Sequence, residues 1–123
     1  RERGENTITA WGTGEPTREF LYVKDAADGI LTATERYNRS DPVNLGSGKE
    51  ISIKNLIELI ADLTRFNGEI NWDTSKPDGQ PRRKLDTSRA REQFDWSATT
   101  AFKDGLLQTI EWYESNRQAI IND

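Results

Sequence analysis

Short runs of apolar residues, bounded by glycine, proline and polar residues, recur along the chain and are typical of short β-strands. One of them, at residues 20–23, is apolar at every position, so we expect it to be buried on both faces. These runs are too short and too few for a self-contained doubly wound sheet. The strands predicted in this way are residues 8–11, 20–23, 43–45 and 70–72.

Apolar residues at helical spacing follow Ser52, whose hydroxyl is well suited to cap the first turn of a helix. Asn67 and Gly68 are expected to end this helix. An earlier helix, capped by Asp25 and running to about Tyr37, is rich in alanine and glycine, so we expect it to pack closely against a neighbour. The apolar face of the helix after Ser52 consists of Ile53, Leu56, Ile57, Ile60 and Leu63 or Thr64.

Two further helices are predicted toward the end of the chain. A short one starts at Thr87 or Ser88 and ends at about Phe94. A long terminal helix follows, with its inner face marked by apolar residues at helical spacing, namely Phe102, Leu106, Ile110 and Tyr113. Strands and helices are interspersed without a repeat. We therefore predict that residues 1–123 form one small α+β domain of short strands and about four helices.

The composition limits what this domain can do. Of its 123 residues, 31% are charged and 33% hydrophobic, and a formal net charge of −4 speaks against general binding of nucleic acid. No apolar run approaches the roughly 18 residues of a membrane span, and no signal peptide is evident. Cysteine and histidine are both absent, which removes disulfides, thiolate zinc sites and the usual general base near neutral pH. We expect a cytoplasmic protein without a metal site or a membrane partner.

The sequence SKPDGQPRRKLD, residues 75–86, locally reverses the acidic charge of the chain. It places Lys76, Arg82, Arg83 and Lys84 around two prolines, a glycine and Asp78. Arg and Lys donors bind phosphate oxygens more strongly than neutral donors do, so a stiff loop of this kind suits a doubly charged anion such as a pyrophosphate. The alternative is a solvated turn whose charges only keep the surface soluble.

A second candidate lies in WGTGEPTREFLYVKD, residues 11–25, where a strand that ends in Trp11 is followed by a glycine-bounded turn. Arg18 then enters the next strand beside Glu19. An arginine that is held by a flanking carboxylate is well placed to bind a phosphate, and the indole can pack against a sugar or a base. The alternative is a surface Arg–Glu pair beside a tryptophan in the core.

Several motifs that would carry chemistry are missing from the chain. No glycine-rich dinucleotide fingerprint follows a strand, and the GSG turn at residues 46–48 is too short to be one. No Tyr-x-x-x-Lys pair is present, because Ala, Asp and Arg stand four positions after Tyr22, Tyr37 and Tyr113. We therefore expect no catalytic residue and no cofactor-binding residue in this chain.

The two segments together resemble the extended short-chain dehydrogenase/reductases, the NAD(P)-dependent nucleotide-sugar epimerases and dehydratases. The runs WGTG at residues 11–14 and REFLYV at residues 18–23, with Asp25, look like the signature of that superfamily, and VNLGSG at residues 43–48 matches the strand and turn that follow. The loop SKPDGQPRRKLD is similar to that of the epimerase-reductases acting on a GDP-4-keto-6-deoxymannose. One departure is Lys24, which stands where the family often has an acidic residue.

The resemblance implies a role in substrate binding for five residues. Trp11 and Arg18 would line the site of a nucleotide sugar, with Arg18 on its diphosphate. Asp78 would accept hydrogen bonds from a hydroxyl or a base edge. Lys76 or Arg82 would add positive charge nearby.

By the same resemblance, the chain is the carboxyl-terminal, substrate-binding part of a Rossmann-type enzyme. The missing partner would be an N-terminal dinucleotide-binding domain with the NADP or NAD site and the catalytic Tyr-x-x-x-Lys pair. The absent initiator Met and the likeness of residues 1–6 to a frayed helix end indicate a piece of a longer protein. We expect this piece alone to be inactive and to bind no cofactor, with a GDP-sugar as the favoured ligand. Enzymes of UDP- or dTDP-sugars and a non-catalytic interaction module are the alternatives.

Overall fold

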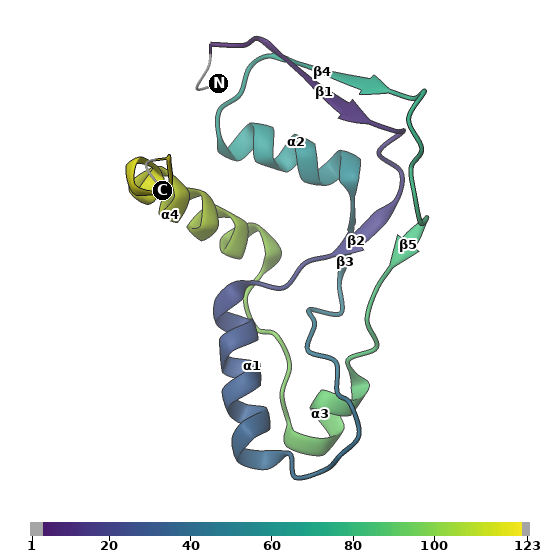
Figure 1. The fold of residues 1–123 in the computed structure, drawn as a ribbon, viewed down its shortest axis with the longest axis vertical. Helices are drawn as coiled ribbons and strands as arrows, with labels where there is room; N and C mark the ends of the chain where they lie inside the picture. Colours follow the sequence, from purple (N-terminus) through teal and green to yellow (C-terminus); the bar gives the residue numbers. More distant parts are fainter. Residues whose placement is uncertain (1–3, 122–123) are drawn as a thin grey trace. The chain divides into compact units, whose positions relative to one another are not determined.

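The computed structural model describes residues 4–121 and divides them into two compact units, which are treated separately below. Unit 1 combines the described residues up to Glu19 with Gly48–Lys84, and unit 2 combines Phe20–Ser47 with the residues from Leu85 onward. Figure 1 shows the order of their elements along the chain. The expected helix end at residues 1–6 lies partly outside the described residues.

Unit 1 is built on parallel strand pairs that are joined by two neighbouring loops. β1 (Thr7–Trp11) pairs in parallel with β4 (Glu69–Asp73). β2 (Thr17–Glu19) lies between antiparallel β3 (Glu50–Ser52) and parallel β5 (Arg82–Arg83). Because β1 leads to β2 and β4 leads to β5, the loops between them begin side by side and end side by side (Figure 1).

The helix of unit 1, α2 (Ile53–Leu63), begins where the sequence predicts. The Ser52 hydroxyl accepts a hydrogen bond from the backbone N–H of Asn55 at 3.1 Å and so caps the first turn. Its apolar side is half-buried and borders a hollow of about 340 Å³ shared with β1. The helix ends before the predicted Asn67 and Gly68, because Arg65, with φ of 54°, already takes a left-handed conformation.

Unit 2 contains α1 (Val23–Arg36), α3 (Ser88–Phe94) and α4 (Phe102–Ile121). Its core is small. Among the described residues, the buried hydrophobic ones are Ala90, Phe94 and Trp96. Partly buried residues from both stretches of unit 2 pack against this cluster, namely Leu21, Ala33, Tyr37, Val43, Leu45 and Ala98.

The predicted close packing of α1 is confirmed at Gly29. A Cβ atom on this residue would lie 2.8 Å from the ring of Trp96, closer than real Cβ atoms approach. The indole N–H of Trp96 also donates a hydrogen bond to the Asp28 carboxylate at 2.9 Å. Trp96 is therefore fixed against the backbone of α1 both by shape and by a hydrogen bond.

The predicted strand at residues 20–23 is wrong. The strand is β2, which ends at Glu19, and α1 starts at Val23, whose side chain is 70% exposed. Phe20 packs on the ring of Phe102 with centroids 5.8 Å apart, and Leu21 packs on the core of unit 2. The apolar run thus reflects packing of a connecting segment rather than pairing in a sheet.

Two smaller predictions also fail. Tyr22 is the N-cap of α1, and Asp25 lies within its first turn, where its buried carboxylate accepts hydrogen bonds from the backbone N–H and the hydroxyl of Thr100 at 3.1 and 2.9 Å. Residues 43–45 form no strand, because Val43 and Leu45 pack on the core of unit 2 instead of joining a ladder. The predicted fold class is confirmed, since the described chain is a mixed α/β structure with four helices and short strands.

Candidate functional site

The candidate site is formed by the two neighbouring loops of unit 1, residues 12–16 after β1 and residues 74–81 after β4. The backbone N–H of Gly12 donates to the carbonyl of Asp73 at 2.9 Å where the loops begin. The N–H of Thr17 donates to the carbonyl of Pro81 at 2.9 Å where they end. Backbone bonds at both ends therefore hold the glycine-bounded turn beside the basic loop.

Asp78 joins the two loops at their centre. Its Oδ1 accepts a hydrogen bond from the backbone N–H of Thr13 at 2.6 Å, and its Oδ2 accepts one from the Thr13 hydroxyl at 2.7 Å. These bonds stabilise the charged form and hold the pKa of the Asp78 carboxyl below its ordinary value. Both oxygens are engaged, although each carboxylate oxygen keeps a second lone pair for an outside donor.

Two glycines allow this approach of the loops. Gly12 has φ of +81°, and a Cβ atom there would lie 2.2 Å from Oδ1 of Asp78. Gly14 has φ of +78°, and its Cβ would lie 2.5 Å from the ring of Trp72. The positive φ and the lack of space both disfavour any side chain at Gly12 and Gly14. The conformation of the WGTG turn therefore depends on its two glycines.

Trp11 and Lys76 meet at the start of the two loops. The Trp11 side chain is 71% exposed, which overturns the alternative of a tryptophan in the core. The ammonium group of Lys76 lies 5.7 Å from the centroid of the indole, within the range of a cation–π interaction. The site thus offers an exposed aromatic face with a positive charge above it.

Arg18 lies in β2 and is half-buried. Its guanidinium donates to the carbonyl of Thr17 at 2.7 Å, and one terminal nitrogen lies 3.9 Å from the position of a Cβ on Gly79, so the side chain reaches the basic loop. Glu19, expected to hold Arg18, instead accepts a hydrogen bond from the backbone N–H of Gly48 at 2.9 Å.

Arg82 is engaged in an ion pair that sequence reasoning did not anticipate. Its guanidinium donates to both carboxylate oxygens of Glu50, at 2.6 to 3.0 Å. The pairing lowers the pKa of Glu50 and raises that of Arg82. The charge of Arg82 is therefore largely balanced within unit 1, whereas Glu50 and Thr13 are residues whose roles the sequence did not signal.

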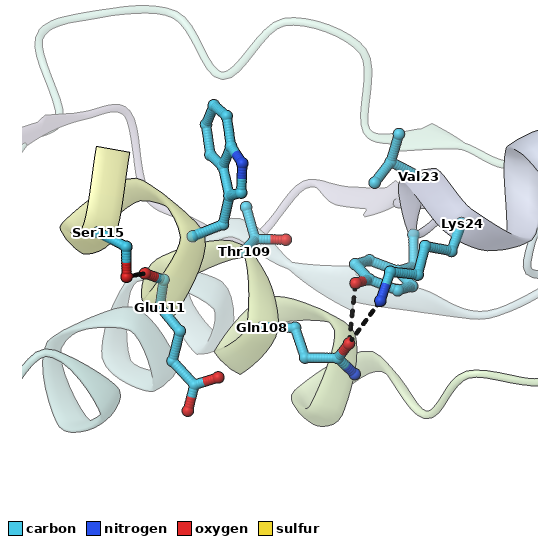
Figure 2. Close-up of a pocket in the computed structure, with 8 residues that line it drawn as sticks. Val23, Lys24, Gln108, Thr109, Glu111 and Ser115 are labelled. Carbon is cyan, nitrogen blue, oxygen red and sulfur yellow. Dashed lines mark hydrogen bonds between the residues drawn. The ribbon is translucent and has the colours of Figure 1, made fainter. Parts of the chain in front are cut away.

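A separate hollow of about 700 Å³ lies in unit 2, between the start of α1 and the side of α4. Figure 2 shows that the Gln108 side chain is directed toward Lys24; its Oε1 accepts hydrogen bonds from the Tyr22 hydroxyl at 2.9 Å and from the Lys24 ammonium at 3.5 Å. Val23 and the 59% exposed Trp112 provide apolar walls. None of the five predicted substrate residues lines this hollow, since all five lie in unit 1.

Within residues 4–121, no group of three or more acidic side chains is placed to hold a metal ion. No helix in the same range is long and apolar enough to cross a membrane. The two loops of unit 1 and the adjoining strands carry an exposed aromatic face, several cations and one oriented carboxylate.

Comparison with known proteins gives this site a context. Residues 1–46 match the NAD dependent epimerase/dehydratase family. GDP-L-fucose synthase 1 of Arabidopsis thaliana is 42% identical over 113 residues, which cover 92% of this chain and 35% of the relative. A crystal structure of a GDP-L-fucose synthetase from Naegleria fowleri superimposes with a TM-score of 0.85 at 29% identity, over 91% of this chain and 35% of that one.

A further structural relative is RMD from Pseudomonas aeruginosa, solved as a complex with NADPH, with a TM-score of 0.79 and 26% identity over 90% of this chain and 37% of that one. The chain is thus homologous to enzymes of the NAD-dependent epimerase/dehydratase family, as its two loops predict. Within that family, GDP-L-fucose synthases are among its relatives. The chain spans about a third of the length of the relatives that it matches.

Proposed function

We propose that this chain is the nucleotide-sugar-binding portion of an NAD(P)-dependent nucleotide-sugar epimerase/reductase that acts on a GDP-sugar, as a GDP-L-fucose synthase does. The observation that carries the proposal is the exposed indole of Trp11 beneath Lys76, where the two loops of unit 1 begin. Asp78 lies in the second of these loops, and Arg18 lies in β2, the strand that follows the first. The relation to GDP-L-fucose synthases supports the choice of base.

Each group of the site has a matching group on such a ligand. The flat face of Trp11 suits a base or a sugar ring, and the cations suit a diphosphate. Asp78, fixed by Thr13 and held in its charged form, suits a hydroxyl or amine donor. These residues bind and orient a substrate, and none is placed to move a proton at a reacting carbon.

In a protein of the relatives' length, the part outside this chain would then carry out the cofactor chemistry. We expect such a protein to act in the cytoplasm. An N-terminal dinucleotide-binding domain would bind NADP or NAD and transfer the hydride. Exposed apolar residues on α1 support the presence of such a domain. In unit 2, Val23, Ile30 and Leu31 are 70%, 59% and 65% exposed. Apolar side chains on one helix side favour contact with another protein surface. The second candidate function is that of a non-catalytic interaction module, which would bind its partner through the same exposed residues of α1.

Calorimetric titration of the chain with GDP-mannose tests the proposal. Arg18→Ala should weaken binding by about 1.5–3 kcal/mol, the cost of one hydrogen bond to a charged group. Arg39→Ala, an exposed arginine of unit 2, is the matched control and should bind like the wild type.

Competition with UDP and dTDP separates the favoured substrate from the alternatives. GDP should displace GDP-mannose more effectively than either pyrimidine nucleotide. Equal competition by all three would contradict the choice of base. Wild-type protein that binds no nucleotide sugar would favour the interaction module.

A further inference from the structure

The sequence contains one Asn-Gly pair, Asn67-Gly68, and the structure places it in the connection between α2 and β4. In such a pair the backbone nitrogen of the second residue can attack the side-chain amide of the first. Glycine favours this attack, because it has no Cβ atom in the way and its backbone adopts conformations that other residues resist. The question is whether the fold leaves the two reacting groups free.

Both reacting groups are free of hydrogen bonds to the rest of the chain. Residues 66–68 belong to neither a helix nor a strand, and Asn67 is exposed. Within residues 4–121, neither the Asn67 carboxamide nor the backbone N–H of Gly68 has a hydrogen-bond partner. The nitrogen can therefore approach the side-chain carbonyl without breaking a bond of the fold.

The chain also has Asp-Gly pairs, which can react in the same way, but the fold protects them. Gly29 lies within α1 and Gly105 within α4, where the Gly105 N–H donates to the carbonyl of Ala101 at 3.0 Å. The Asp78 carboxylate is held by Thr13 through both of its oxygens, and its lowered pKa keeps it in the charged form, which resists nucleophilic attack. Among the described residues, the Asn-Gly pair alone combines a free N–H with a neutral side chain.

We propose that Asn67 is a modification site, where the chain deamidates spontaneously through a cyclic imide with Gly68. The Gly68 nitrogen forms a bond to Cγ of Asn67 and gives its proton to the solvent, and the side-chain nitrogen leaves as ammonia. Water then opens the imide at either of its two carbonyls and yields aspartate or isoaspartate. Water is the one reactant besides the chain itself, and the step does not depend on the proposed function.

Isoaspartate at this position would disturb the start of the parallel strand pair in unit 1. A Cβ atom on Gly68 would overlap with the carbonyl oxygen of Asn6, so the two backbones are already in close contact. The same carbonyl accepts a hydrogen bond from the Glu69 N–H at 2.8 Å, next to the first paired residues, Thr7 and Glu69. Isoaspartate lengthens the main chain by one methylene group, for which a close-packed contact has no room. The isoaspartate form should therefore be less stable than the Asn67→Asp variant, which adds only the charge.

Incubation of the full chain at neutral pH, followed by peptide mapping with electron-transfer mass spectrometry, tests the site. Aspartate and isoaspartate should appear at residue 67 before they appear at Asn38, an exposed asparagine that is followed by arginine. Methyl transfer from labelled S-adenosylmethionine by a protein-isoaspartate methyltransferase gives a second readout. This labelling should be lost in Asn67→Gln, because attack on the longer side chain would have to close a larger ring.

The outcomes decide the site and its consequence separately. An Asn67 that stays intact, or that reacts no faster than Asn38, would overturn the assignment, as would undiminished labelling of Asn67→Gln. Urea unfolding of the separated isoaspartate form tests the effect on the strand pair. A midpoint below that of Asn67→Asp would support this effect, whereas equal midpoints would overturn it and keep the site. Binding of a nucleotide sugar enters none of these measurements, so failure of the proposed function would leave the inference standing.

Discussion

Asp78 and Thr13 are separated by 65 positions in the sequence, and their two hydrogen bonds hold the loops of the candidate site together. The carboxylate therefore has a structural use even without a ligand. Because it must be charged to accept both bonds fully, the geometry of the site depends on its protonation state. This dependence leads to a test in which no ligand is needed.

Asp78→Asn should remove a contribution to stability that varies with pH. The pKa of Asp78 is lowered in the folded chain, so its contribution is present above the ordinary carboxyl pKa and is lost as pH falls through the folded value. The difference in unfolding free energy between wild type and variant should thus be largest at pH 7 and shrink below about pH 4. Urea unfolding at pH 7, 4 and 3 measures it. Asp41→Asn controls for loss of an exposed carboxylate, and a difference independent of pH would contradict the prediction.

The sequence predicts which residues belong to the candidate site better than it predicts which side chains pair with one another. Trp11 and Lys76 could be selected because residue type and loop composition already suit a phosphate-bearing ligand, whereas Asp78 is selected by the family resemblance. The partner of Arg82 could not be predicted, because Glu50 lies 32 positions away and meets it only through the strand order β3-β2-β5.

At the scale of elements, the first residue of α2 is determined by the local sequence, through the Ser52 cap. Ser52→Ala removes the hydroxyl that accepts the Asn55 N–H, and it should lower the unfolding free energy by about 0.5–2 kcal/mol. Urea unfolding followed by circular dichroism measures the change. Ser40→Ala, an exposed serine in a bend, is the matched control. Equal effects of the two substitutions would argue against capping by Ser52.

Gly29 provides a test in which two effects oppose each other. Alanine is favoured over glycine within a helix by roughly 0.5–1 kcal/mol. However, its Cβ would lie 2.8 Å from the Trp96 ring and 3.1 Å from Leu45, and overpacking of a core costs about 1–3 kcal/mol. Gly29→Ala should therefore be destabilising by up to about 2 kcal/mol in urea unfolding. The loss should shrink in a Trp96→Phe background, and a more stable Gly29→Ala protein would contradict the prediction.

Helices could be predicted from the sequence more fully than strands. The predicted helix after Ser52 and the predicted short helix ending at about Phe94 correspond to α2 and α3 within a few residues. The apolar runs at residues 20–23 and 43–45 resemble strands because they pack on a core, which a short run cannot distinguish from pairing. β2 and β5 are polar, with the sequences TRE and RR, and they exist because neighbouring strands pair with them.

At the scale of the whole molecule, the chain corresponds to about a third of the length of its relatives, and the proposed function assigns it substrate binding alone. The purified chain should therefore show no oxidation of NADPH with GDP-4-keto-6-deoxymannose. Loss of NADPH absorbance measures this, with the GDP-L-fucose synthase 1 of Arabidopsis thaliana assayed in parallel. Measurable turnover by the chain would contradict a purely substrate-binding role.

The interleaving of the two units along the chain has a consequence for synthesis on the ribosome. Unit 1 is complete in sequence at Lys84, whereas α1 must wait for α3, whose Ala90 and Phe94 form the core near it. At roughly 5–20 residues per second this delay lasts several seconds, during which Ile30 and Leu31 and the side of α1 beneath Trp96 are all uncovered. We therefore expect unit 1 to fold before unit 2, and α1 to be the segment that a chaperone binds.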